Sequence, residues 1–185
     1  NKKEPTMASN RHLGRIVTLQ TLYEFEFRER AGDQTADIMS ILERNLNRYG
    51  EVIGDQEFVH ELCSGIAKVY TKLDELLQPI APEWPIAQIA AIDRNVLRIG
   101  LFELLFMGKT VPPKVAINEA IELAKSFGSD NSRSFINGVL GTAYKSLVEN
   151  NNEQTNQGAD SVVETSPSQG TEPEVDQTDQ SSAEN

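Results

Sequence analysis

The sequence has few of the residues from which catalytic centres and covalent crosslinks are built. It contains one cysteine, Cys63, and two histidines, His12 and His60. A single cysteine excludes a disulfide or a thiolate cluster within the chain, and two histidines are too few for a histidine-rich metal site. The Walker A, GxGxxG, GxSxG and HExxH motifs are all missing. We therefore expect no enzyme, no cofactor and no metal site.

Two residue patterns bear on this expectation. Glu57 and His60 stand three positions apart, which is half of a di-iron carboxylate motif on a helix. The motif needs a second Glu-x-x-His, and the sequence has none, so we interpret the pair as part of a helix surface. Cys63 follows Leu62 in an apolar stretch, which is typical of a buried and unreactive thiol.

Long apolar runs are also missing. No stretch approaches the roughly 18–20 apolar residues that a membrane-spanning helix needs. Lys2 and Lys3 are not followed by the apolar segment of a secretory signal. The sequence therefore predicts a cytoplasmic protein without a membrane partner.

Apolar residues are unevenly distributed along the chain. Residues 150–185 contain no aromatic residue, leucine, isoleucine, lysine or arginine, but they hold eight acidic residues. Removing these eight negative charges from the formal net charge of −11 leaves −3 for residues 1–149. Such a segment cannot bury enough apolar surface to offset the entropy lost on ordering. We predict a flexible N-terminal arm at 1–8, a folded domain at 9–148 and a disordered acidic tail at 149–185.

Within 9–148, apolar residues recur at helical spacing, and the alternation typical of strands is nearly absent. This pattern predicts an all-α domain. The expected helices lie at about 10–31, 38–49, 56–78, 86–90, 94–106, 113–127 and 132–148. Ser9 or Asn10 is expected to cap the first of these helices and Asp93 the fifth. Pro113 suits the first position of the sixth. On the first helix, one face is expected to be marked by Leu13, Ile16, Val17, Gln20, Tyr23 and Phe27.

Basic residues gather at the start of the first predicted helix. Arg11, His12 and Arg15 lie within its first turns, and residues 11 and 15 are one turn apart on the same face. Arginine side chains pair well with phosphate oxygens. Gln20 and Tyr23 follow on the same helix and suit contacts with an unpaired RNA base. An ordinary solvated basic turn, with Tyr23 in the core, explains the same residues equally well.

Two longer stretches carry a family resemblance. Residues 111–140, VPPKVAINEAIELAKSFGSDNSRSFINGVL, resemble the C-terminal signature of the NusB family. Residues 94–104, RNVLRIGLFEL, resemble the helix that precedes that signature in the family, and residues 11–23 are similar to its arginine-rich start. With the helices between them, the resemblance covers about residues 9–148.

The resemblance implies a compact NusB-like bundle of two helical subdomains. It also implies a transcription antitermination factor that binds single-stranded boxA-type RNA together with NusE, a small-subunit ribosomal protein. That pair helps the RNA polymerase antitermination complex to read through terminators, notably in ribosomal RNA operons. The resemblance assigns RNA binding to Arg11, His12, Arg15, Gln20, Tyr23, Asn131, Arg133 and Phe135, and partner binding to Asp93 and Arg94.

The sequence departs from the family pattern at two places. His12 and Leu13 stand where close relatives carry further arginines, and Ser134 stands where some relatives have a lysine. Fewer phosphate contacts lower RNA affinity and its dependence on salt together. We therefore expect tight RNA binding to depend strongly on the partner protein.

Two other functions remain open at this point. NusB-like domains also occur fused to ribosomal RNA cytosine methyltransferases, as accessory RNA-binding domains. That activity needs a following α/β domain, whereas residue 148 is followed here by the acidic tail. The other alternative is a NusB-like protein-interaction module without RNA binding, which the reduced number of basic residues leaves open.

Overall fold

The computed structural model describes residues 7–49 and 51–149. Within these residues the regular elements are all helical, and no strand occurs. Six are α-helices: α1 Met7–Arg30, α2 Ile38–Tyr49, α3 Gln56–Leu77, α4 Ala91–Phe106, α5 Pro113–Phe127 and α6 Ser132–Ala143. A short 3₁₀ helix, η1 (Ile86–Gln88), precedes α4, and a π-helical segment, η2 (Tyr144–Glu149), continues α6. The predicted all-α class is confirmed.

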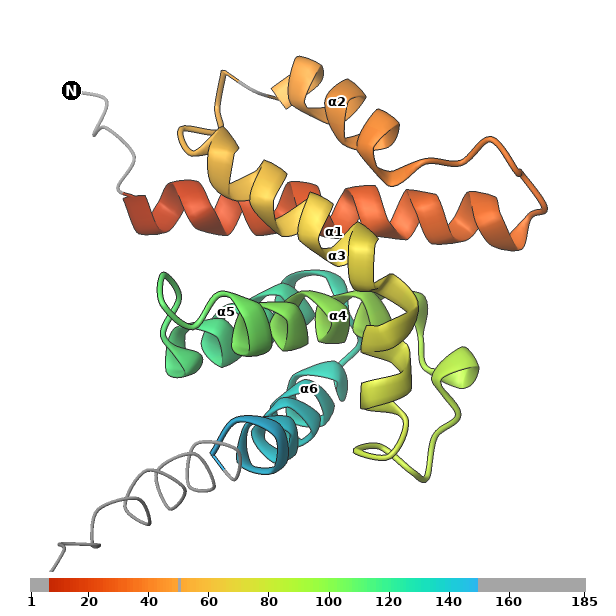
Figure 1. Ribbon diagram of the computed structural model, residues 1–185, viewed down its shortest axis with the longest axis vertical. Coiled ribbons are helices and arrows are strands. Elements are labelled where there is room, and N and C mark those ends of the chain that lie inside the picture. The colour runs from red at the N-terminus through yellow and green to blue at the C-terminus, as the bar shows by residue number, and fades with distance from the viewer. Residues whose placement is uncertain (1–6, 50, 150–185) are drawn as a thin grey trace, which may run out of the picture.

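The helices form two groups, as Figure 1 shows. Helices α1 and α2 lie side by side in the upper group, and α4, α5 and α6 pack together in the lower group. Helix α3 belongs to both groups, because its backbone leaves helical geometry at Val69 (φ −122°, ψ 18°) and its second half turns toward α4. These groups correspond to the two subdomains that the sequence predicts.

Local sequence explains several helix ends. Asp55 caps α3, since its Oδ1 accepts a hydrogen bond from the backbone N–H of Phe58 at 3.0 Å. Pro79 follows the end of α3, and Pro113 occupies the first position of α5, as predicted. Gly32 follows α1 with φ +83°, a conformation that glycine adopts without steric cost.

Two predicted helix starts are wrong. Helix α1 begins at Met7 and not after Ser9 or Asn10, so Met7 and Ala8 of the predicted arm are helical, while residues 1–6 lie outside the described part. Asp93 does not cap α4, because that helix already begins at Ala91. The predicted tail begins at residue 149, which ends η2, and its remainder, 150–185, is also outside the described residues.

The buried face of α1 differs from the predicted one. Gln20, Tyr23 and Phe27 are exposed, with 66% of Phe27 accessible to solvent, while Arg15 and Glu26 are buried. The reason is that α1 packs against α2, α3 and α4 together. The buried face of α1 is therefore wider than one apolar stripe. It includes charged side chains, which form ion pairs with residues of α4. No helix among the described residues is long and apolar enough to span a membrane.

Candidate nucleic-acid interface

The first turns of α1 bring two of the predicted RNA-binding residues to a partly exposed edge of the fold. Arg11 donates from Nε to Asp55 Oδ2 at 3.1 Å and from Nη1 to the backbone oxygen of Thr110 at 3.2 Å. Its side chain is 28% exposed. His12 Nδ1 lies 2.8 Å from Glu119 Oε2 on α5. Both side chains are therefore held in place at the surface, where they can still meet a ligand.

Arg15 has a different environment, although it lies one turn after Arg11. It is 2% exposed, and its guanidinium donates to both carboxylate oxygens of Glu103 on α4, at 2.6–3.1 Å. Phe58 lies beneath it at 5.0 Å from the ring centre. Burial raises the pKa of the Glu103 carboxyl, and the hydrogen bonds from Arg15 oppose that shift. This pair joins α1 to α4. The sequence predicts the same RNA-binding role for Arg11 and Arg15, but only Arg11 lies at the surface.

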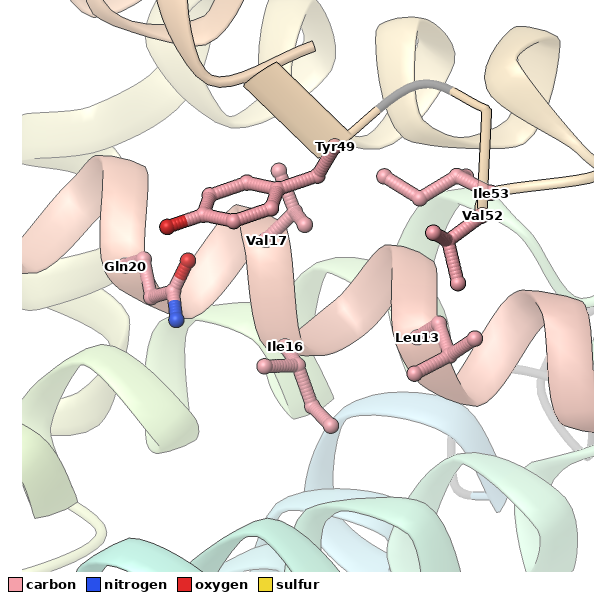
Figure 2. Close-up of a pocket in the computed structure, with 7 residues that line it drawn as sticks. All are labelled: Leu13, Ile16, Val17, Gln20, Tyr49, Val52 and Ile53. Atoms are coloured by element: carbon pink, nitrogen blue, oxygen red, sulfur yellow. The ribbon is translucent and has the colours of Figure 1, made fainter.

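Gln20 and Tyr23 lie on the exposed side of α1, and the alternative that places Tyr23 in the core is wrong. Tyr23 is 42% exposed. Gln20 stands at one end of a shallow apolar groove between α1 and the segment that joins α2 to α3, beside Tyr49 (Figure 2). Both residues are accessible to a ligand, but they lie on α1 beyond the turns that hold Arg11 and His12. Their role in RNA binding stays a prediction.

The start of α6 gathers the other predicted RNA-binding residues. Asn131 and Arg133 are exposed, and Phe135 is half-buried. Arg133 lines a polar groove between α5 and α6, together with Asn118 and Lys125. Phe135 lines a separate pocket with Trp84. The fold therefore places these three residues around the first turn of one helix.

The two residues predicted to bind a partner are largely inside the fold. Arg94 is 1% exposed; it donates to Glu26 and to the backbone oxygens of Ile86 and Ile89. Asp93 is 8% exposed and accepts from Ser132 Oγ at 2.9 Å. Arg94 thus ties α4 to α1 and the η1 turn, and as it stands it cannot touch another protein. Only Asp93 reaches a pocket.

Glu26 is the centre of a buried network of charges. Arg94, Arg98 and Asn95 all donate to its carboxylate, and Arg98 also donates to both oxygens of Asp74 at 2.7 Å. Burial alone would raise the pKa of Glu26, but the hydrogen bonds from Arg94 and Arg98 outweigh it and hold the pKa below its ordinary value. The network joins α1, α3 and α4 and so fixes the orientation of the surface residues of α1.

Several surface residues near these sites were not predicted from the sequence. Lys109 and Lys114 are exposed on either side of the loop that accepts the Arg11 hydrogen bond. Phe27 and Trp84 are 66% and 54% exposed. The two lysines could have been noticed as the flanks of the Val-Pro-Pro segment, and Trp84 as an aromatic residue in a proline-bounded turn. Among the described residues, no group of three histidine, cysteine or acidic side chains could hold a metal ion.

Comparisons with known proteins point to one family. The profile of the NusB family matches residues 12–145. The chain is similar to the transcription antitermination protein NusB of Chloroflexus aggregans, with 46% identity over 138 residues that cover 74% of this chain and 87% of the relative.

Solved structures give the same result for the fold. NusB of T. maritima superposes with a TM-score of 0.67 and 32% identity, covering 78% of this chain and 96% of that one. A crystal structure of the antitermination factors NusB and NusE in complex with dsRNA matches with a TM-score of 0.62 over 74% of this chain and 96% of that one; at 20% identity, this likeness concerns the fold. Since the profile spans nearly the whole described region and two relatives are 46% and 40% identical, the chain belongs to the NusB family.

Proposed function

We propose that this protein is a transcription antitermination factor, which binds boxA-type RNA together with a NusE-type ribosomal protein and promotes read-through in ribosomal RNA operons. The observation that carries the proposal is the domain-length match to proteins named for transcription antitermination. The protein acts in the cytoplasm, on nascent RNA within the RNA polymerase antitermination complex. It contributes binding and positioning in that complex and no catalysis.

The RNA follows the edge formed by α1, α5 and α6. Arg11 and His12 stand at one end of this edge, next to the exposed Lys109 and Lys114. The groove between α5 and α6 continues it with Arg133. A chain that carries net negative charge needs such a local basic edge to attract phosphates. Arg15 supports the edge from inside the fold, because its guanidinium is already engaged by Glu103.

In place of the RNA contact predicted for Tyr23, we propose that the partner protein covers the exposed aromatic part of α1. Tyr23 and Phe27 line a shallow pocket with Arg30 and Ala91, where the end of α1 meets the start of α4. Exposed aromatic residues next to an arginine are typical of protein interfaces. This surface lies on the same helix as Arg11 and His12 but several turns further along, so a bound partner would strengthen RNA binding by holding α1, which both ligands touch.

Fluorescence anisotropy of a labelled boxA-type RNA tests the proposal, with and without the NusE-type protein. We expect sequence-dependent binding that strengthens with the partner. Arg11→Ala and Arg133→Ala should each weaken binding and reduce the salt slope by about 1, as expected for one lost phosphate contact. Lys72→Ala is the matched control, since Lys72 is an exposed cation paired with Glu75 on α3, away from the proposed edge.

Absence of RNA binding even with the partner present would refute the RNA-binding proposal. A partner complex that still forms under those conditions would instead support a protein-interaction module. One observation favours that second function. Arg11 and His12 are already paired with the carboxylates of Asp55 and Glu119, which compete with RNA phosphates for them.

A further inference from the structure

Three exposed lysines lie at one end of the lower helix group. Lys109 is in the loop after α4, Lys114 is in the first turn of α5 and Lys145 is in η2. We call these three residues the lysine cluster. None of them forms an ion pair with another residue that the structure describes. The lysine cluster is therefore positive surface that the described part of the fold leaves uncompensated.

The directions of the helices bring these lysines to the same end. α5 and α6 are joined by the short segment 128–131 and pack together, so they are antiparallel, and the end of α6 lies beside the start of α5. α6 runs in the same direction as α4, because Ser132 bonds to Asp93 at their starts and a Cβ at Gly100 would lie 2.5 Å from Leu140 further along. η2 continues α6, contacts α4 and so leads toward the loop that carries Lys109 (Figure 1).

The chain continues from Glu149, at this end of the fold, into its most acidic part. Residues 172–184 hold five acidic residues and no lysine or arginine, and we call them the acidic segment. They begin 23 residues after Glu149. A flexible chain of that length or slightly more, as the sequence predicts here, spans about 24–35 Å. α5 has 15 residues and is therefore about 22 Å long, so the acidic segment can reach the lysine cluster and any point along α5.

We propose that the acidic segment lies across the lysine cluster and competes with RNA for it, so that the chain restrains its own RNA binding. The inference rests on the proposed function, in which Lys109 and Lys114 flank the RNA edge. Carboxylates and phosphates are both anions that pair with lysine. Because the acidic segment is tethered to the fold, its effective concentration at the cluster is about millimolar, so even weak exposed ion pairs hold it there until RNA displaces it.

The other cations of the RNA edge are less available to the acidic segment. Arg11 and His12 already face the carboxylates of Asp55 and Glu119. Arg133 shares its groove between α5 and α6 with two acidic side chains. A second negatively charged chain is attracted more weakly to such paired cations than to unpaired lysines. The acidic segment should therefore cover the lysine cluster first.

Carbodiimide crosslinking of the full chain tests the contact without RNA, because it joins a carboxylate to an adjacent amine as an amide. Residues 146–185 contain no lysine or arginine, so trypsin releases them as one peptide, and mass spectrometry identifies the lysine attached to it. In the monomeric gel band we expect links from the acidic segment to the lysine cluster at 50 mM salt. They should be few at 0.5 M salt, where the Debye length is about 4 Å. Lys72, exposed on α3, is the internal control and should carry few links.

Replacing the five acidic residues of the acidic segment by their amides tests the competition. By fluorescence anisotropy, this neutralised variant should bind the boxA-type RNA about three- to tenfold more tightly than the wild type at 50 mM salt, since one phosphate contact alone contributes about threefold over a fourfold change in salt. The two affinities should converge at 0.5 M salt. The matched control makes the same change in net charge on the upper helix group and should gain much less. It replaces five exposed glutamates by glutamine: Glu43, Glu51, Glu57, Glu61 and Glu75.

The outcomes distinguish the inference from the function on which it rests. Equal RNA affinity of the wild type and the neutralised variant at 50 mM salt, or an equal gain in the control, overturns the inference and leaves the proposed function standing. Crosslinks that reach Lys72 as readily as the lysine cluster also overturn it. So do crosslinks that form only to the NusE-type protein, since they assign the acidic segment to the partner. No RNA binding by either variant, even with the partner, refutes both.

Discussion

Replacing Arg15 by alanine should destabilise the protein far more than replacing Arg11. Arg15 and Glu103 have side-chain exposures of 2% and 0%, so Arg15→Ala leaves a carboxylate buried without its cation. Removing one partner of a buried ion pair costs about 3–5 kcal/mol. Arg11 and Asp55 are 28% and 25% exposed, and a pair near the surface contributes about 0.2–1 kcal/mol.

Urea unfolding followed by far-UV circular dichroism measures both losses. A domain of this size is typically stable by about 5–15 kcal/mol, so Arg15→Ala should shift the midpoint strongly and Arg11→Ala only slightly. The double variant Arg15→Met/Glu103→Leu should recover much of the stability, because a buried ion pair can often be replaced by apolar residues of similar volume. A loss below about 1 kcal/mol for Arg15→Ala would refute the burial argument.

The loss should also depend on pH in a defined direction. Burial raises the pKa of Glu103 above its ordinary value of 4.5, and removing Arg15 takes away the hydrogen bonds that oppose this shift. The folded variant then binds a proton more tightly than the unfolded chain does. The free energy of unfolding of Arg15→Ala should therefore be closest to that of the wild type near pH 4.5. The variant should lose further stability as the pH rises through the raised pKa of Glu103. A deficit that is constant with pH, or that grows on acidification, would contradict this.

Four further predictions concern other positions, of which Glu26 and Cys63 are buried. The pKa of Glu26 is held below 4.5 in the folded protein, so the stability it contributes is present above that pH and is lost as the pH falls through its folded pKa. In Glu26→Gln, the free energy of unfolding in urea should therefore fall less on acidification than in the wild type. Burial raises the pKa of the Cys63 thiol to about 12, so iodoacetamide should alkylate it only after unfolding, as mass spectrometry would show. Gly65→Ala should destabilise by about 1–3 kcal/mol, since its Cβ would lie 2.1 Å from Phe102 Cζ. Gly138→Ala, with nothing within 4 Å, should instead stabilise α6 by about 0.5–1 kcal/mol.

The fold could be predicted from the sequence because its signals are local. Helical periodicity, Pro79 and Pro113 mark the helix boundaries that the structure has at those places. The errors arise where a residue's role depends on distant contacts. Arg15 meets Glu103, 88 positions later, and Arg94 meets Glu26, 68 positions earlier. No periodicity indicates that such arginines are buried.

The candidate site could be predicted only in part for the same reason. The sequence identified Arg11, His12 and Arg133, which the structure places at the surface. Arg15 lies close to them in the sequence, but an arginine can pair equally well with an RNA phosphate and with a buried carboxylate. Which of the two it meets depends on how α1 is rotated against α4, and that rotation is set by the packing of the whole domain.

This packing suggests how one helix serves RNA, partner and fold together. The buried residues Arg15 and Glu26 both bond to α4 and lie toward opposite ends of α1, so they fix its rotation along its length. His12 is thereby directed toward α5 and Arg11 toward Asp55 and the backbone of Thr110, while Tyr23 and Phe27 face solvent. An effect of Arg15→Ala on RNA affinity would thus be indirect. It should weaken both RNA and partner binding, whereas Arg11→Ala, which changes only the surface, should weaken RNA binding alone.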